Sequence, residues 1–360
     1  MQRGSKIFRE ISLYFLSSKK MNVKLLFTFC GILVMVAFTS ADEIQFLVPK
    51  QFPPTVYDFK KNKISKEKIL LGRVLFYDNI LSKNQTISCA SCHSNYNAFA
   101  HTDHALSHGI YDSIGTRNAP ALMNLAWQPI FMWDGAINHL DMQALAPIHN
   151  KIEMGEHIAN VVKKLQESPI YPKLFYDAYD DSIVSGEHTL KALSAFMLTL
   201  VSSESKYDSV MNGYLSFNPK EKNGYKLYAI HCSACHTEPL FTSHSFENNG
   251  LVLDTTLTDY GRMIITKDRT DSLKFKVPTL RNIEWTYPYM HDGRFKTLNE
   301  VLNHYSTSKV HNPSVATQLL KPISLNAKEK VDLLSFLLTL SDKKFIFDPK
   351  HAFPKEILNR

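Results

Sequence analysis

Two short strings of cysteine and histidine hold the residues of this 360-residue chain that are best suited to chemistry. They read Cys89-Ala-Ser-Cys92-His93 and Cys232-Ser-Ala-Cys235-His236. This spacing is typical of c-type haem attachment, in which two thiols form thioethers with one porphyrin and the next imidazole binds the iron. We therefore predict two covalently bound haems, with His93 and His236 as the proximal ligands.

Two disulfide bonds or one four-cysteine zinc site are the alternatives for these four cysteines. Neither alternative explains why a histidine follows both pairs. A disulfide between such close cysteines needs no histidine neighbour, and a zinc ion held by four thiolates leaves both imidazoles without a role. The repeated histidine thus favours haem.

The residues before the first string predict export. From Met21 the chain carries Lys24, an apolar stretch at 25–38 and small residues up to Ala41, which is typical of a secretory signal peptide. An uncleaved N-terminal anchor is the alternative, although the apolar run is short for a membrane span. We assign residues 1–41 to the leader and expect translation to start at Met21. We expect the body of the protein in the periplasm.

Composition excludes several classes of protein. The chain is 44% hydrophobic and 21% charged, which is ordinary for a globular protein and excludes disorder and a polytopic membrane protein. Lys and Arg outnumber Asp and Glu by 41 to 34, but six of the basic and one of the acidic side chains lie in the first 41 residues. The near-neutral remainder predicts no nucleic-acid partner.

The spacing of the two strings indicates a duplication. Cys89 and Cys232 lie 143 residues apart, and the apolar stretch at 193–200 recurs 140 residues later at 333–340. Each copy therefore runs from a haem motif to an apolar helix. We predict two cytochrome c-like haem domains related by duplication, a first half at 42–206 and a second half at 207–360.

Apolar residues recur at spacings of three and four in six segments, which predicts a mainly α fold. Thr297 with Glu300, and Asn326 with Glu329, match the capping-box pattern of helix starts. The stretch 207–219 breaks the helical pattern and is the predicted linker. The segments are 64–77, 156–167, 187–203, 219–230, 297–305 and 327–341, with long irregular loops at 94–120 and 237–290 around the haems.

A set of polar and aromatic residues follows the first motif, and with it the chain resembles a known family. That family is the bacterial di-haem cytochrome c peroxidases, including MauG-like members that oxidise a protein substrate. The resemblance covers nearly all of the chain after the leader. It rests on both haem motifs, Arg117-Asn-Ala-Pro120, Trp133-Asp-Gly135, the spacing of Gln143, Pro147 and Glu153, Pro278-Thr-Leu-Arg-Asn282, and Tyr289-Met-His-Asp-Gly-Arg-Phe-Lys-Thr-Leu298.

The resemblance implies a peroxidatic first haem and an electron-transferring second haem. Glu153 matches the acid/base, since splitting a peroxide O–O bond requires a proton to move from the near to the leaving oxygen. Gln143 matches the residue that hydrogen-bonds peroxide, Pro147 leaves the sixth iron position open, and Trp133 lies between the haems. Without the resemblance, an alternative interpretation of Glu153 is a solvated carboxylate at a helix start, and an alternative for Trp133 is a core residue.

In the family a histidine after the first motif blocks the peroxidatic iron until the other haem is reduced. His101, His104 and His108 lie on this loop, and His108 fits best by position. Solvated or metal-scavenging histidines are the alternative reading.

For the second haem, the family places its sixth ligand fourteen residues after the histidine of the His-Asp-Gly string, which is Tyr305 here. MauG-like members carry tyrosine there, and a phenolate favours ferric iron, whereas a thioether favours ferrous iron. Met290 is the competing ligand, although it also reads as packing against the porphyrin.

The family also holds an inter-domain calcium ion, and Asn118, Thr286 and Pro288 match its protein ligands. Ligation by oxygen alone suits calcium. The alternative is that Asn118 caps the turn before Pro120.

The leading functional hypothesis is a periplasmic peroxidase. It would reduce hydrogen peroxide to water with electrons from a small cytochrome c or cupredoxin, and the resemblance implies a homodimer. One alternative is a MauG-like oxidase that modifies a partner protein. Another is a non-catalytic electron-transfer cytochrome, against which Glu153 and Gln143 count.

Overall fold

The computed structural model describes residues 43–307 and 313–358. The chain from Ile44 onward forms one compact unit. Helices dominate it, which confirms the predicted mainly α fold, and the only sheet in the described ranges pairs β1 (Phe246–Glu247) with β2 (Phe275–Lys276) in antiparallel register. The predicted leader at 1–41 lies outside the described residues. None of the helices in 43–307 and 313–358 is long and apolar enough to cross a membrane.

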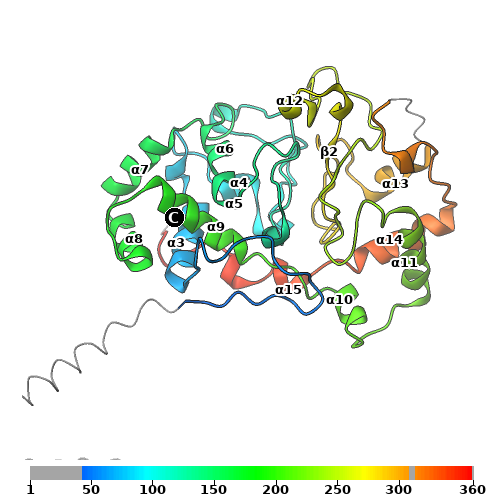
Figure 1. Ribbon diagram of the computed structural model, residues 1–360, viewed down its shortest axis with the longest axis horizontal. Helices are drawn as coiled ribbons and strands as arrows, with labels where there is room; N and C mark the ends of the chain where they lie inside the picture. Colours follow the sequence, from blue (N-terminus) through cyan, green and yellow to red (C-terminus); the bar gives the residue numbers. More distant parts are fainter. Residues whose placement is uncertain (1–42, 308–312, 359–360) are drawn as a thin grey trace, which may run out of the picture. The chain divides into compact units, whose positions relative to one another are not determined.

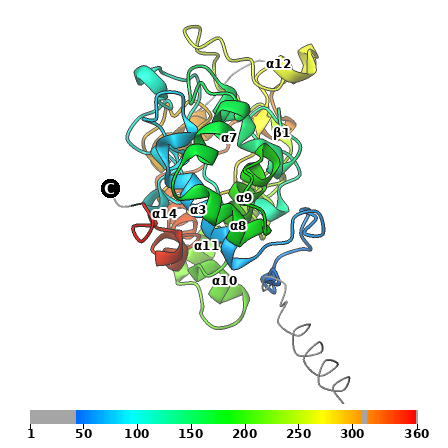
Figure 2. The same ribbon diagram turned by 90° about the vertical axis from the view of Figure 1, so that its left-hand side faces the viewer.

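The first half is built on α3 (Lys66–Tyr77), α7 (Ile158–Glu167), α8 (Tyr171–Tyr179) and α9 (Gly186–Leu198). Figures 1 and 2 show α3 lying beside α8 and α9, which it contacts. The backbones of α3 and α9 cross closely at Gly72. Any side chain at this position would overlap the carbonyl oxygen of Ala192, so the crossing requires glycine.

The second half repeats this crossing. Helix α11 (Pro219–His231) packs on α14 (Ala327–Leu338), and α13 (Leu298–Thr307) contacts α14 (Figure 1). A side chain at Gly224 would overlap the carbonyl oxygen of Asp332, as one at Gly72 would overlap that of Ala192. The two helix pairs are therefore copies of one unit, as the motif spacing predicts.

The remaining helical segments are short. They are α4 (Cys89–Cys92), α5 (Leu140–Gln143), α6 (Leu145–His149), α10 (Lys206–Met211), α12 (Met263–Thr266) and α15 (Lys343–Ile346), with 3-10 turns η1 (Asn79–Leu81), η2 (Asn95–Asn97), η3 (Ile110–Asp112), η4 (Leu125–Trp127), η5 (Arg269–Asp271), η6 (Thr317–Leu319) and η7 (Pro349–His351). Four of them lie inside the irregular segments predicted at 94–120 and 237–290, namely η2, η3, α12 and η5.

Both predicted capping boxes form. The Thr297 hydroxyl accepts the Glu300 N–H at 3.3 Å while the Glu300 carboxylate accepts the Thr297 N–H at 2.7 Å. Asn326 and Glu329 make the same reciprocal pair at the start of α14. The six predicted helices are all present, which confirms the periodicity from which they were inferred.

Two helices end earlier than predicted. Helix α9 stops at Leu198 instead of 203, and α14 stops at Leu338 instead of 341. The carbonyl of Leu200 accepts the Asn124 N–H at 2.8 Å, and that of Leu340 accepts the Asn282 N–H at 3.0 Å. These long-range bonds draw the chain out of the helix, and apolar spacing alone could not reveal them.

The predicted linker at 207–219 was wrong at its start. Residues 207–211 belong to α10, where Tyr207 and Asp208 are buried. Asp208 pairs with the fully buried Arg281 through two hydrogen bonds of 2.8 and 2.9 Å. Burial opposes ionisation of Asp208, but the hydrogen bonds and charge of Arg281 lower its pKa below the ordinary value.

A third repeat, offset by 158 residues, shapes the region between the helices. Phe131 bridges to Ile137 as Tyr289 bridges to Phe295, and the paired turns contain Trp133-Asp-Gly and His291-Asp-Gly. Across the junction, the Asn118 N–H donates to the His291 carbonyl, and the Lys276 N–H donates to the Trp133 carbonyl, each at 2.7 Å. The halves therefore face each other with pseudo-twofold symmetry.

The C-terminal segment returns to the first half. Phe345, Ile346 and Leu358 belong to the hydrophobic cluster that also contains α3 and α9, and the Tyr77 hydroxyl donates to the His351 carbonyl at 2.6 Å. A second hydrophobic cluster joins α11 and α14. The boundary between 206 and 207 stays a prediction.

Candidate functional site

One large cavity, of about 600 Å³, lies where the two halves meet. Both motifs line it through Cys92, His93, Cys232, Cys235 and His236. Of the four motif cysteines, Cys89 alone does not line it and packs against the first hydrophobic cluster instead. The rest of the wall is largely apolar, so thiols and imidazoles from both motifs meet in one cavity suited to porphyrin.

A hydrogen bond from Nδ1 to a backbone carbonyl orients the ring of each motif histidine. His93 Nδ1 hydrogen-bonds the Phe99 carbonyl at 2.8 Å, and His236 Nδ1 bonds the Pro278 carbonyl at 3.0 Å. Because a carbonyl can only accept, Nδ1 carries the proton and Nε2 is left as the donor to a metal. Burial lowers both pKa values to about 4, so the imidazoles are neutral, as iron ligation requires.

The alternatives to haem find no support in the geometry. All four motif cysteines are free thiols. Burial raises the pKa of Cys89 and Cys232 to about 12 and that of Cys92 to about 11, which keeps these thiols protonated. In the described ranges no three His, Cys, Asp or Glu residues are arranged to hold a metal ion.

The predicted peroxidatic set is brought together. Trp133, Gln143, Pro147 and Glu153 all line the cavity. Gln143 ends α5 and Pro147 lies in α6. A proline has no backbone N–H and no ligating side chain, so Pro147 adds nothing that could bind iron.

Glu153 has the environment expected of a proton carrier. Burial raises its pKa above the ordinary value, and an Asn150 amide that donates to Oε1 at 2.7 Å partly opposes this effect. The Ile110 N–H fixes the Glu153 backbone by donating to its carbonyl at 2.8 Å. A carboxyl group whose pKa moves toward neutrality can both accept and return a proton.

Arg117 ties the halves together beside Trp133. Its guanidinium donates to Asp259 at 2.6 and 2.9 Å and to Asp134 at 2.7 Å. The Trp133 indole N–H donates to the Asn118 carbonyl at 2.9 Å. The indole is therefore fixed at the junction between the two motifs.

The three loop histidines form a row outside the cavity wall. His101 Nε2 lies 3.2 Å from His104 Nδ1, and the rings of His104 and His108 stack with centroids 4.2 Å apart. His108 Nδ1 bonds Asp112 Oδ1 at 2.7 Å. None of the three lines the cavity, so the gating role of His108 stays a prediction.

Both candidates for the sixth ligand of the second haem line the cavity. The Met290 sulfur accepts the Asn249 amide at 3.2 Å. Burial raises the pKa of Tyr305, the neighbouring Cys232 and Cys235 raise it further, and a hydrogen bond with Asn249 opposes them. The amide thus touches both candidates, and the choice between them stays a prediction.

The three residues predicted to hold calcium also line the cavity. The Asn118 amide donates to the Ala105 carbonyl at 3.0 Å, which leaves its side-chain oxygen as an acceptor. Thr286 and Pro288 are close in sequence and supply backbone carbonyls. Oxygen donors of this kind fit a hard cation.

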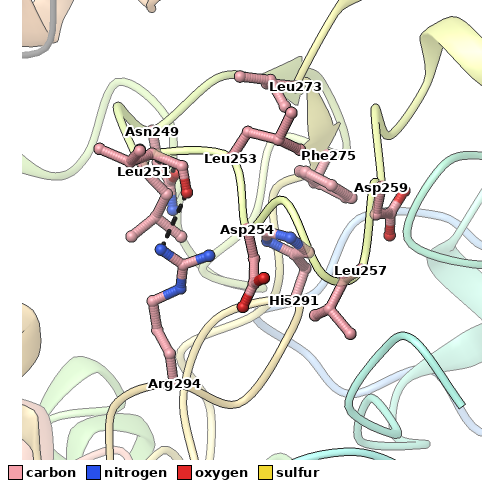
Figure 3. Close-up of a pocket in the computed structure, with 11 residues that line it drawn as sticks. Asn249, Leu251, Leu253, Asp254, Leu257, Asp259, Leu273, Phe275, His291 and Arg294 are labelled. Carbon is pink, nitrogen blue, oxygen red and sulfur yellow. Dashed lines mark hydrogen bonds between the residues drawn. The ribbon is translucent and has the colours of Figure 1, made fainter.

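A second, much smaller pocket lies behind His291 (Figure 3). Its volume is about 10 Å³, which is near the minimum for one water molecule. Arg294 crosses it to donate to the Val252 carbonyl at 3.0 Å. The His291 ring stacks on Phe275 with centroids 3.7 Å apart. This pocket has no room for an organic substrate.

Sequence reasoning missed Gln128 and Lys276, which line the cavity and bond each other at 2.8 Å. A signal was present, because Pro120-Ala-Leu-Met-Asn-Leu-Ala-Trp127 recurs as Pro278-Thr-Leu-Arg-Asn-Ile-Glu-Trp285. Aligning these strings makes Asn118 equivalent to Lys276, and Gln128 equivalent to Thr286.

Known proteins match the chain over most of its length. The family model described as di-haem cytochrome c peroxidase matches residues 66–216. The methylamine utilization protein MauG of Methylorubrum extorquens is 33% identical, over 80% of this chain and 82% of that protein. The cytochrome c551 peroxidase of Nitrosomonas europaea is 32% identical, over 75% of this chain and 79% of that protein.

A solved structure matches as well. The crystal structure of a MauG-like protein associated with microbial copper homeostasis aligns with a TM-score of 0.77 and 32% identity, and the match covers 86% of this chain and 99% of the other. The diheme peroxidase BthA from Burkholderia thailandensis, with a TM-score of 0.69 and 20% identity, shares the fold.

Proposed function

The chain belongs to the di-haem cytochrome c peroxidase family, and from this membership we propose that it reduces hydrogen peroxide to water. One peroxide, two protons and two electrons give two waters. The electrons come singly from a small cytochrome c or cupredoxin. The observation that carries the proposal is the buried Glu153 carboxyl, with its raised pKa, in the same cavity as both motif histidines.

Two c-type haems supply the redox chemistry when bound. Cys89 and Cys92 hold the first through thioethers, and Cys232 and Cys235 hold the second. His93 and His236 are the proximal ligands, which their Nδ1 hydrogen bonds to backbone carbonyls support. The cavity shared by the two motifs is the reason to place both haems there.

The residues around the first haem handle peroxide and its protons. Glu153 takes the proton from the near oxygen of peroxide and gives it to the leaving oxygen, which then departs as water. Gln143 orients the peroxide by hydrogen bonding. Pro147 supplies no ligand, so the peroxide has an open approach to the first iron.

Trp133 lies at the junction that electrons delivered to the second haem would cross to reach the first. The indole N–H bond to Asn118 and the Lys276 N–H bond to the Trp133 carbonyl hold this side chain from both halves. A calcium ion bound by Asn118, Thr286 and Pro288 stiffens the same junction. The protein acts in the periplasm, and His108 closes the first iron in the fully oxidised protein.

A second candidate function is the MauG-like oxidation of a side chain on a partner protein. The specific observation in its favour is that Tyr305, our candidate for the sixth ligand of the second haem, lines the cavity. A phenolate there stabilises ferric iron. Similarity to the MauG and MauG-like proteins adds to this support. Met290 is the ligand if the second haem has a high potential.

Steady-state peroxide consumption with a reduced small cytochrome tests the proposal. We expect turnover that Glu153→Gln removes and that Glu167→Gln, an exposed carboxylate on α7, leaves intact. Absence of turnover in a protein that holds two haem equivalents overturns the peroxidase proposal. Oxidation of a partner protein by added peroxide in that case favours the second candidate.

A further inference from the structure

The junction between the halves contains an ammonium group without a counter-charge. Lys276, in β2, is half-buried and lines the cavity. Its Nζ donates to the neutral Gln128 Oε1 at 2.8 Å, and within 43–307 and 313–358 no carboxylate pairs with it. Burial lowers its pKa to about 8. An ammonium group has three donors, and burying its charge is costly unless an anion compensates.

The carboxylates of the same cavity are engaged elsewhere. Three acidic residues line it, and each has a different partner. Asp134 accepts from Arg117, Glu153 from Asn150, and Glu247 from Ser245. The anion that Lys276 lacks therefore has to come from whatever fills the cavity.

A second unused donor lies close to Lys276. Both ring nitrogens of His244 are buried without a hydrogen-bond partner among the described residues. Burial, together with the nearby Lys276 charge, lowers the pKa of His244 to about 4. An imidazole always carries at least one N–H, so this part of the junction holds an unpaired imidazole donor near the ammonium group and no anion among the described residues.

The pseudo-twofold repeat explains why a positive charge lies here. Lys276 is equivalent to Asn118, and its partner Gln128 is equivalent to Thr286. The backbones agree, because each of residues 118 and 276 donates its N–H across the junction at 2.7 Å. Asn118 and Thr286 are the residues proposed to hold calcium. At the equivalent place in the other half, the chain supplies its own cation.

We propose that the Lys276 ammonium binds a haem propionate at the junction, as the built-in counterpart of the cation at the Asn118 site. This inference rests on the two-haem occupancy of the proposed function. Haem is the ligand proposed for this cavity. Its two propionate side chains are carboxylates and can supply the anion. The interaction satisfies the ammonium and fixes a positive charge beside the porphyrin, which disfavours the ferric state and raises that haem's reduction potential.

The test compares Lys276→Met, Lys276→Arg and a control, Lys274→Met, in the holoprotein. Lys274 lies two residues earlier, and its Nζ pairs with Asp271 at 3.2 Å instead of lining the cavity. The readouts are the haem content, the propionate bending band in resonance Raman spectra, and the reduction potential of each haem in a spectroscopic redox titration.

We expect Lys276→Met to shift the propionate band and to lower the potential of one haem, whereas Lys276→Arg and Lys274→Met stay near the parent protein. The haem whose potential moves is the one that donates the propionate. Haem loss in Lys276→Met that Lys276→Arg restores also supports the proposal.

Two results overturn it. One is a Lys276→Met protein that matches Lys274→Met in both the propionate band and the potentials. The other is haem loss in both Lys276→Met and Lys276→Arg, because the positive charge kept by arginine would then not restore haem binding. These readouts do not depend on peroxide turnover, so a failed peroxidase assay and a failed propionate assignment are separate outcomes.

Discussion

The two halves use one framework for opposite purposes. In each, a Trp- or His-Asp-Gly turn precedes a helical segment that faces the cavity, and the residue fourteen positions after the Trp or His differs. It is Pro147 in the first half and Tyr305 in the second. A proline leaves iron open on that side, whereas a tyrosine can close it. This one difference in a duplicated framework is the basis on which we propose a peroxide site in the first half and an electron-transfer site in the second.

A second contrast lies in how the halves neutralise buried groups. The string Pro120-Ala-Leu-Met123 corresponds to Pro278-Thr-Leu-Arg281, so Met123 in the first core is matched by a buried cation in the second. Arg281 pairs with Asp208 at the start of the second half, and no such pair is needed around Met123. The second half therefore holds a buried ion pair at the position where the first half has an apolar side chain.

The largest effect is expected at Glu153, the carboxyl group proposed to move the protons of peroxide at the first haem. Glu153→Gln should lower the rate of peroxide reduction by about 100- to 10,000-fold, because general acid–base catalysis contributes on that scale. Stopped-flow mixing with peroxide measures this rate. An unchanged rate would remove Glu153 from the chemistry.

The pH dependence of the same reaction sharpens the assignment. Burial raises the Glu153 pKa, so the carboxylate that accepts the first proton is lost as pH falls through a value above the ordinary one for glutamate. The rate of the parent protein should decrease on that acidic side. In Glu153→Gln this limb should vanish, and a limb that persists would belong to another group.

Breaking the second-half ion pair should cost about 3–5 kcal/mol of unfolding free energy, since it strands a buried charge. Arg281→Met installs the first-half residue and leaves the Asp208 carboxylate without its cation, with only neutral donors such as Ser205. Lys344→Met is the matched control, because its partner Glu204 and the lysine are both exposed and such pairs contribute about 0–1 kcal/mol. Denaturant titration of the holoprotein measures both. Equal losses of unfolding free energy in Arg281→Met and Lys344→Met would show that the buried ion pair contributes no more than an exposed one.

The two glycine crossings should respond alike. Gly72→Ala and Gly224→Ala each place a side chain against a carbonyl oxygen, and overpacking of this kind costs about 1–3 kcal/mol. Gly186→Ala serves as the control, because its new side chain meets only other side chains, Ile158 at 3.0 Å and Val162 at 3.9 Å. Unequal losses of unfolding free energy at positions 72 and 224 would show that the two helix pairs contribute differently to stability.

The smallest effect on stability, and the most specific spectral one, is expected for Tyr305→Phe. Removing one hydroxyl should change unfolding free energy by about 0.5–1.5 kcal/mol. If the phenolate binds the second iron, the ferric spectrum of that haem changes while the first haem is unaffected. An unaltered spectrum excludes Tyr305, and Met290→Leu should then produce the change.

Local signals in the sequence determined the haem motifs, the six principal helices and both capping boxes. These features depend on residues within a few positions of one another, such as Thr297 with Glu300. For the same reason the sequence supported the family resemblance, and with it the set of Trp133, Gln143, Pro147 and Glu153 that the structure gathers around one cavity.

Tertiary structure alone decided the rest, because those features join residues far apart in the chain. Lys276 meets Gln128 across 148 residues, and Asp208 meets Arg281 across 73. The early ends of α9 and α14 and the return of the C-terminal segment to the first core follow from similar contacts. A local pattern carries no record of which distant group satisfies a buried charge or a free carbonyl, so only the folded chain could supply it.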